Sequence, residues 1–353
     1  MPVTTTVPGY VPLFALTRGE TLESVHFGAV AIVDAQGRLL ASVGDPWAVT
    51  YLRSTAKPFQ ALPFVEDGGP DRFGLTDEEI ALLCASHSGT DRHVAVVQRI
   101  QQKAGVKEPQ LLCGSHPPYD AATAEALKAR GEQPTPNRHN CSGKHTGMLA
   151  QAVLHGWPTA DYIDREHPVQ QRILRTFAEM CGLPPEAVQV GVDGCSAPNF
   201  ATPLYHVAYG YARLMDPRDL PPQRAAAARA IVQAMTRHPF MVGGPGRFDT
   251  LLMEATQGRV LAKGGAEGYQ GIGLPPGALG PGTPGVGIAF KIADGDGRKN
   301  RARPAVALEI LRQLGVLTEI PAALRPFGPE VTVTNWRGLT VGKGFPTFSL
   351  KPA

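Results

Sequence analysis

The sequence predicts an α+β fold in which one antiparallel sheet is built from both ends of the chain. Short β-branched runs separated by glycine-rich turns occur near the N-terminus and again after residue 241. The region between them has the periodicity of amphipathic helices. We therefore expect one domain over residues 1–353, with its sheet in about 10–60 and 241–350 and its mainly helical part in about 61–240.

The first predicted strands lie within residues 23–45. The run AVAIV is rich in β-branched residues, DAQGR is typical of a turn, and LLASVG returns as a second strand. The segment EVTVTNWRGLTVGKG, residues 330–344, has the same pattern, with NWRG as its turn. Between residues 241 and 295, dense glycines separate the apolar runs RVLAKGG and GVGIAFKIADG, which predict further strands joined by long loops.

Helices are expected in the middle of the chain. Thr76 and Glu79 have the spacing of a capping box, which predicts that a helix begins at Thr76. Amphipathic helices are expected over residues 90–106 and 167–183, each closed by a glycine. Further helices are predicted over 201–215, 222–237 and 304–314.

The composition excludes several classes of function. Of the 353 residues 18% are charged, the net charge is +3, and Lys and Arg are scattered, so we expect no binding to nucleic acid. The N-terminus is a poor signal peptide, and no apolar run approaches the ~18 residues that cross a bilayer. These features predict a soluble, cytoplasmic protein without membrane contact. The five cysteines predict reduced thiols rather than a disulfide framework.

The segment RSTAKPF, residues 53–59, has the pattern of an activated serine. If Ser54 begins a helix, Lys57 lies one turn later on the same face. Pro58 is tolerated only in a first helical turn, which supports a helix start near Ser54. A buried lysine can take the proton of a serine because desolvation lowers its pKa. Taken alone, the pattern is explained better by a capped helix with a solvated lysine than by catalysis.

Two later segments could complete a serine–lysine site. In CASHSGTD, residues 84–91, Ser86 follows an apolar helix, although a plain helix end explains that pattern as well. In RVLAKGGAEGY, Lys263 ends an apolar strand and Gly264 follows directly. A glycine there lets a substrate approach the backbone, whose N–H could help to form an oxyanion hole. Lys291 is a weaker candidate because no glycine follows it directly.

Two cysteines lie in polar, turn-rich loops, Cys141 in NRHNCSGKHTGML and Cys195 in GVDGCSAPNFATPL. Such positions are unusual for cysteine, which is mostly a small buried hydrophobe. Together the two thiols could bind zinc, with His139, His145 or Asp193 nearby. The spacing of these residues is weak evidence for a zinc site, because neither C-x-x-C nor H-E-x-x-H is present.

Six ordered motifs together resemble one known family. They are RSTAKPFQALP, CASHSGTD, NCSGKHTGML, DGCSAPNFATPL, RHPFMVGGPGRFDT and AKGGAEG, and they resemble the rhizobial-type (class 3, asparaginase II-like) L-asparaginases. The resemblance extends from about residue 10 to 345. It implies hydrolysis of L-asparagine to L-aspartate and ammonia, and a fold related to serine β-lactamases and serine-dependent glutaminases. The penicillin-recognising enzymes also place S-x-x-K, a polar motif and K-T-G in this order.

The resemblance also implies roles for individual residues. Ser54 would be the nucleophile with Lys57 beside it, and Ser86 and Lys263 would form a second Ser–Lys pair. The family carries a metal site, usually zinc, which would assist substrate positioning here with the ligands Cys141, Lys144 and Cys195. Homodimers are common in the family, so we expect a homodimer.

The expected mechanism is acyl transfer. Lys57, with help from Lys263, takes the proton of Ser54, and Ser86 relays protons. Backbone N–H groups near Ser54 and of the glycines at 264–265 hold the oxyanion. The charged ends of the substrate need partners from the polar motifs, for which the candidates are Arg53, His139, Asn140 and Asp193.

Several alternatives stay open from the sequence. Ser86 could form the covalent bond in place of Ser54, although the helix start fixed by Pro58 favours Ser54. The chain could also be a glutaminase, a β-lactam-recognising serine hydrolase, or a non-catalytic protein that binds a metal or an amino acid.

Overall fold

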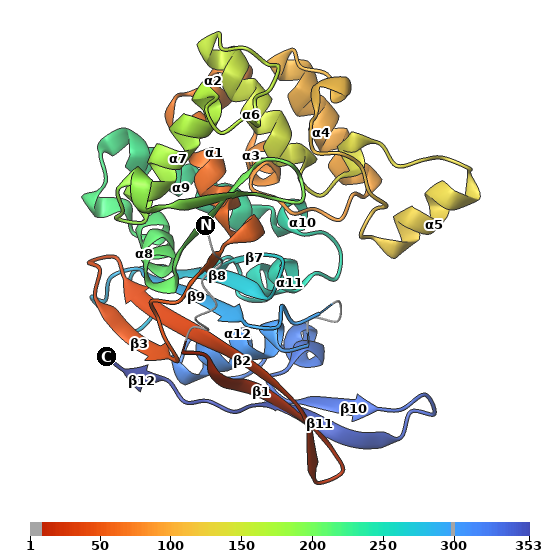
Figure 1. Cartoon of the computed structure of the whole chain (residues 1–353), viewed down its shortest axis with the longest axis vertical. Coiled ribbons are helices and arrows are strands. Elements are labelled where there is room, and N and C mark those ends of the chain that lie inside the picture. The colour runs from red at the N-terminus through yellow and green to blue at the C-terminus, as the bar shows by residue number, and fades with distance from the viewer. Residues whose placement is uncertain (1–8, 298–300) are drawn as a thin grey trace, which may run out of the picture.

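A computed structural model describes residues 9–297 and 301–353 of the chain. These residues form a nine-stranded antiparallel sheet in the order β10-β11-β1-β2-β9-β8-β7, with β3 paired to β2 and β12 to β3 (Figure 1). The strands are β1 (Val11–Arg18), β2 (Thr21–Asp34), β3 (Leu39–Val43), β7 (Leu261–Gly264), β8 (Tyr269–Leu274), β9 (Val286–Ile292), β10 (Val331–Thr334), β11 (Thr340–Pro346) and β12 (Lys351–Pro352).

The prediction that both chain ends share one sheet is confirmed. β1 pairs antiparallel with β11, so that Ala15 lies opposite Phe345, and β2 pairs with β9. The sequence did not identify β1 or β8. β1 (VPLFALTR) contains a proline and no continuous β-branched run, and β8 (YQGIGL) contains two glycines, so neither has the β-branched pattern that identified the other strands. Pairing with their neighbours in the sheet decides their conformation.

Helices cover both faces of this sheet. A Cβ on Gly271 or Gly273 of β8 would lie 2.5 Å from Tyr211 or Met215, so these two positions face α8 (Leu204–Met215). Gln270, one residue from Gly271, points to the other face and accepts a hydrogen bond from Arg303 on α12 (Arg303–Gln313) at 2.6 Å. The α+β prediction is therefore confirmed.

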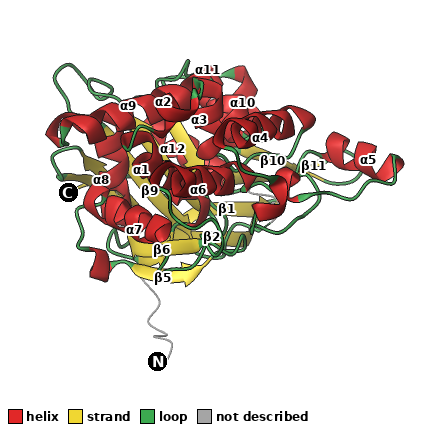
Figure 2. Ribbon diagram, turned by 90° about the horizontal axis from the view of Figure 1, so that it is seen from above, coloured by secondary structure: helices red, strands yellow, loops and turns green. Residues whose placement is uncertain are grey.

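Most of the remaining helices gather on one side of the sheet (Figures 1 and 2). They are α1 (Lys57–Glu66), α2 (Gly69–Phe73), α3 (Asp77–Leu83), α4 (Asp91–Ala104), α5 (Ala121–Ala129), α6 (Ser142–His155), α7 (Pro168–Met180), α9 (Pro222–Arg237), α10 (Pro239–Val242) and α11 (Phe248–Ala255). The capping box at Thr76 and Glu79 is confirmed, and α4 ends at Gly105, as predicted. Among the described residues, none of these helices has the combination of length and apolar sequence that a membrane span requires.

A second, three-stranded sheet was not predicted. Its order is β4-β6-β5, with β4 (Val49–Tyr51), β5 (Gln189–Val192) and β6 (Pro198–Pro203). The helix expected over 201–215 is wrong in its first turn, because residues 201–203 pair in β6 and Pro203 precedes the helix. This small sheet holds the segment before Ser54 next to the loop that carries Cys195.

Candidate active site

Ser86 lies between two lysine amines. Lys57 Nζ and Lys263 Nζ each donate a hydrogen bond to Ser86 Oγ at 3.0 Å. Lys57 also donates to the carbonyls of Ala85 and Asn140, and Lys263 to the carbonyl of Gly264. All three side chains are buried. One hydroxyl in the protein interior therefore connects two basic groups that are more than 200 residues apart in the sequence.

Each member of this cluster is held by a different element. Lys57 is the first residue of α1, whose first turn contains Pro58. Ser86 follows the end of α3, and its backbone N–H donates to the Val242 carbonyl at 2.9 Å. Lys263 lies on β7 at the edge of the large sheet. The site is thus formed where the helical layer contacts the sheet edge.

The environment of Lys263 favours the neutral amine. Burial, followed by the charge of Lys57, lowers the pKa of Lys263 to about 7. Asp249 opposes this shift, whereas Arg247 and Arg303 add to it. A substantial fraction of Lys263 is therefore unprotonated near neutral pH and is able to accept a proton.

Ser54 lies at the junction of two cavities. It belongs to a 3₁₀ turn, Arg53–Ala56, that leads into α1, and it is half-buried. One cavity has a volume of about 190 Å³ and the other about 770 Å³, and Ser54 lines both. Within the described part of the chain, Ser54 Oγ makes no hydrogen bond to protein. The predicted direct contact between Ser54 and Lys57 is wrong, because the Lys57 amine is directed to Ser86.

The predicted oxyanion donors also need correction. The N–H of Gly264 donates to Asp249 Oδ2 at 2.6 Å, and the N–H of Gly265 donates to the Tyr269 carbonyl at 2.8 Å. Both donors are therefore occupied. Ala266, the next residue, lines both cavities together with Ser54. In the described residues, neither the Ser54 nor the Ala266 N–H has a protein acceptor, so these two donors are free.

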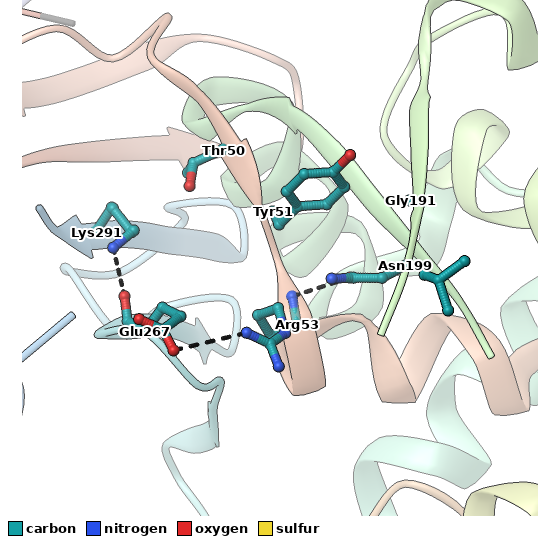
Figure 3. A pocket seen from close by; sticks show the side chains of 8 residues that line it. Thr50, Tyr51, Arg53, Gly191, Asn199, Glu267 and Lys291 are labelled. Atoms are coloured by element: carbon teal, nitrogen blue, oxygen red, sulfur yellow. Dashed lines mark hydrogen bonds and ion pairs between the residues drawn. The ribbon is translucent and has the colours of Figure 1, made fainter. Parts of the chain in front are cut away.

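Arg53 forms part of the wall beside Ser54. Its Nε donates to Asp193 Oδ1 at 2.7 Å, and its Nη1 lies 3.8 Å from Glu267 Oε1. Figure 3 shows the guanidinium directed toward Glu267, while the backbone nitrogen of Arg53 is bonded to Asn199, at 3.1 Å. Arg53 has a φ of 52°, in the left-handed region that non-glycine residues rarely adopt. The bonds to Asp193 and Asn199 hold this conformation directly before Ser54.

The smaller cavity gathers the residues that the sequence predicted for substrate binding. Its lining includes Arg53, His139, Asn140 and Asp193. Gly264, the other residue predicted for this role, instead lines the larger cavity. Burial, followed by the charge of His116, lowers the pKa of His139 to about 4. At neutral pH the wall of the smaller cavity thus includes the charged side chains of Arg53 and Asp193 and the neutral imidazole of His139.

The three predicted metal ligands lie together at the end of the smaller cavity. Lys144 Nζ lies 2.9 Å from Cys195 Sγ, and both Cys141 and Cys195 are buried and line the cavity. A hydrogen bond from Cys195 lowers the pKa of Cys141, against the effect of burial. Among the described residues, no group of three or more His, Cys, Asp and Glu could hold a metal, so a site here depends on the lysine.

The donor set is compatible with zinc. Two thiolates suit a borderline-soft cation, and a lysine amine coordinates when it is neutral. Burial lowers the pKa of Lys144, but the neighbouring Cys195 and Cys141 raise it more strongly, so this amine must lose a proton when a cation binds. The buried His145 Nε2 has no hydrogen-bond partner in the described residues.

Several site residues were missed by the sequence reasoning. Arg247 and Asp249 lie in RHPFMVGGPGRFDT, a segment that the sequence predicts to be a substrate-binding or structural turn without a role for either residue. Ala266 follows the two glycines after Lys263. His116 and Tyr119, which line the smaller cavity, belong to no motif. Their position depends on how the loop before α5 folds back onto the site, which no local pattern reveals.

Comparison with known proteins identifies the family. The model of the L-asparaginase II family matches residues 14–345, nearly the whole chain. The chain belongs to the L-asparaginase II family. It is therefore an amidohydrolase. No curated protein sequence matches the chain.

Glutaminases are among the solved structures that the comparison matched to this chain. One is a probable glutaminase from Bacillus subtilis complexed with 6-diazo-5-oxo-L-norleucine, with 13% identity, a TM-score of 0.39, and coverage of 82% of this chain and 84% of that one. Another is a Bacillus subtilis glutaminase in covalent complex with 5-oxo-L-norleucine, with 13% identity, a TM-score of 0.35, and coverage of 76% and 80%.

The contact between β7 and the Ser54 turn can be tested with Gly265→Ala. A Cβ at this position would lie 2.6 Å from the Leu52 carbonyl and 2.9 Å from Thr55 Oγ1. We expect the two segments to move apart and kcat/KM for the amide substrate to fall by ~10²-fold, because small displacements of catalytic groups have effects of this size.

The matched control is Gly277→Ala. Its Cβ would meet no atom within 4 Å, but its φ of +82° makes the substitution strained. It should therefore lower stability with little effect on turnover. Equal rates for Gly265→Ala and the wild type in a steady-state assay would contradict the assigned packing.

Proposed function

We propose that this chain hydrolyses L-asparagine to L-aspartate and ammonia, with Ser54 as the nucleophile. The observation that carries the proposal is the Ser86 hydroxyl shared by the amines of Lys57 and Lys263, next to two cavities lined by Ser54. A serine hydrolase needs a nucleophile, a base and oxyanion donors in one place, and this arrangement can supply all three.

The proposed acylation begins with neutral Lys263. Lys263 takes the proton of Ser86, while Lys57 remains hydrogen-bonded to Ser86. Ser86 in turn takes the proton of Ser54 once the bound substrate brings together the two hydroxyls, which both line the larger cavity. Ser54 Oγ attacks the carbon of the side-chain amide. The N–H groups of Ser54 and Ala266 hold the developing oxyanion. The C–N bond breaks, the nitrogen takes the proton back through Ser86, and ammonia leaves before water releases aspartate.

The smaller cavity supports an amino-acid substrate of the size of asparagine. Its volume of about 190 Å³ is small, and Arg53 and Asp193 offer opposite charges for the α-carboxylate and the α-amino group. Glutamine has one more methylene, a difference that a fitted pocket typically discriminates by ~10- to 200-fold. Ammonia release from both amides, measured side by side, separates an asparaginase from a glutaminase.

Zinc is the proposed cofactor, with Cys141, Lys144 and Cys195 as its ligands. When bound, it would supply a fixed positive charge at the end of the smaller cavity. The protein's own groups there, Arg53 and Asp193, still orient the substrate. The homodimer and the cytoplasmic location stay predictions from the sequence.

The roles of the two serines predict a graded loss of activity. Ser54→Ala removes the nucleophile and should lower kcat for asparagine by at least ~10³-fold. Ser86→Ala removes the group that relays protons and should lower kcat for asparagine by ~10²-fold, in the range of general acid–base catalysis. Ser88→Ala is the control, because Ser88 Oγ donates to the Gly243 carbonyl at 2.8 Å and belongs to neither cavity. Wild-type turnover by Ser54→Ala would exclude Ser54 as the nucleophile.

The neutral base predicts the pH dependence of the reaction. Because Lys263 must be unprotonated, kcat/KM should rise with pH through about 7 and level off above it. Asp249 raises the pKa of Lys263, so Asp249→Asn should move this rise to lower pH. A rate profile in which Asp249→Asn moves the rise to higher pH would contradict the assignment of Lys263 as the base.

The proposed metal site predicts a zinc content per chain that can be measured without an activity assay. Elemental analysis of the purified protein should find about one zinc per chain, and Cys195→Ser should lose it. Cys181→Ala is the control, because Cys181 is buried at the end of α7, outside both cavities. Equal zinc content in Cys195→Ser and the wild type would rule out the proposed ligand set.

A further inference from the structure

The two cavities that meet at Ser54 are unequal in size. Their shared lining consists of Ser54, Tyr119, Asn140 and Ala266. If the aspartyl part of the substrate occupies the smaller cavity, its amide nitrogen faces the larger one. Ammonia needs about the room of one water molecule, ~30 Å³. The larger cavity, at about 770 Å³, is far larger than this leaving group needs.

The larger cavity presents one positive charge without a partner. Arg247 lines it, and in the described part of the chain its guanidinium forms no ion pair or hydrogen bond. The guanidinium lies 5.8 Å from the centre of the Tyr119 ring, at the boundary with the smaller cavity. This position is suited to an anion on the leaving-group side of Ser54.

The other charged groups of the same cavity are already paired. Arg303, which is buried, donates to Gln270 Oε1 at 2.6 Å and lies 3.9 Å from Asp249. Glu267 lies 3.8 Å from Arg53, and Asp294 lies 2.8 Å from His26 Nδ1. Of the charged groups in this wall, Arg247 alone has no ion-pair partner among the described residues, so its guanidinium is available to a carboxylate.

We propose that the larger cavity is a leaving-group subsite for an α-amino acid, whose carboxylate binds Arg247, and that the chain therefore also hydrolyses β-aspartyl dipeptides. In these compounds the side-chain carboxyl of aspartate is joined to the amino group of a second amino acid. The proposal rests on the proposed function, because it uses the same nucleophile and the same orientation of the aspartyl group.

The reaction balances without any further reactant. Ser54 Oγ attacks the amide carbon and its proton passes to Ser86 and Lys263. The C–N bond then breaks, and the leaving nitrogen takes a proton back through Ser86, so the second amino acid departs with a neutral amine. Water hydrolyses the aspartyl ester on Ser54 and releases aspartate, as it does with asparagine.

The test uses the full-length protein and three substrates: asparagine, β-aspartyl-glycine and β-aspartyl-glycinamide. The last two differ in the terminal carboxylate, which the glycinamide lacks. Charge-assisted hydrogen bonds are worth enough to change affinity by about tenfold or more. We therefore expect the wild type to hydrolyse both dipeptides, with a KM at least about tenfold lower for β-aspartyl-glycine.

Arg247→Met should abolish the difference in KM between β-aspartyl-glycine and β-aspartyl-glycinamide. Its KM for β-aspartyl-glycine should rise to the value for β-aspartyl-glycinamide, whereas any effect on the base Lys263 should change the turnover of all three substrates by the same factor. Arg229→Gln, an exposed arginine on α9, is the matched control and should behave as the wild type. The comparison of the two dipeptides in the wild type needs no variant, so it tests the proposal even if Arg247→Met fails to fold.

The outcomes separate this inference from the proposed function. Turnover of asparagine without turnover of β-aspartyl-glycine would overturn the subsite and leave the asparaginase intact. Equal KM values for the two dipeptides in the wild type would exclude Arg247 as the carboxylate ligand. If asparagine itself is not hydrolysed, the proposed function fails and the subsite proposal fails with it.

Discussion

Two lysine amines share the hydroxyl of Ser86 in the interior of this protein. Like charges at this range repel by a few kcal/mol in a protein environment. Burial of the Lys263 amine has the larger effect and this repulsion adds to it, so the pKa of Lys263 falls to about 7. Burial and the neighbouring charge together make Lys263 a base near neutral pH. The proposed chemistry depends on it.

The fold brings the two amines to Ser86 from two different elements and buries them there. Lys57 begins a helix that is buried along most of its length, and Lys263 lies on an edge strand of the large sheet. Asp249 fixes the adjacent backbone by accepting the N–H of Gly264. Because the Gly264 N–H is already bonded, it cannot bind an oxyanion. The free backbone N–H on this side of the site is that of Ala266, two residues later. One set of contacts thus positions the base and determines which groups can bind an oxyanion.

The sequence predicted the composition of the site better than its contacts. Ser54, Ser86 and Lys263 were identified by motif, and the strands at the two chain ends by β-branched runs. The contact of Lys57 with Ser86 depends on where α3 ends relative to α1, and the occupied N–H of Gly264 depends on the Asp249 carboxylate from α11. Both are tertiary relations between segments that are distant in sequence. Strands β1 and β8 were missed for the same reason, because their pairing with distant segments determines their conformation.

The central claim is that Ser54 forms the covalent bond while Ser86 carries protons. A diazoketone analogue of asparagine, which alkylates an active-site nucleophile, tests this directly when the labelled protein is digested and mapped by mass spectrometry. The account predicts one adduct per chain on Ser54, still formed slowly by Ser86→Ala and absent from Ser54→Ala. An adduct on Ser86 in the wild type, retained in Ser54→Ala, would contradict it.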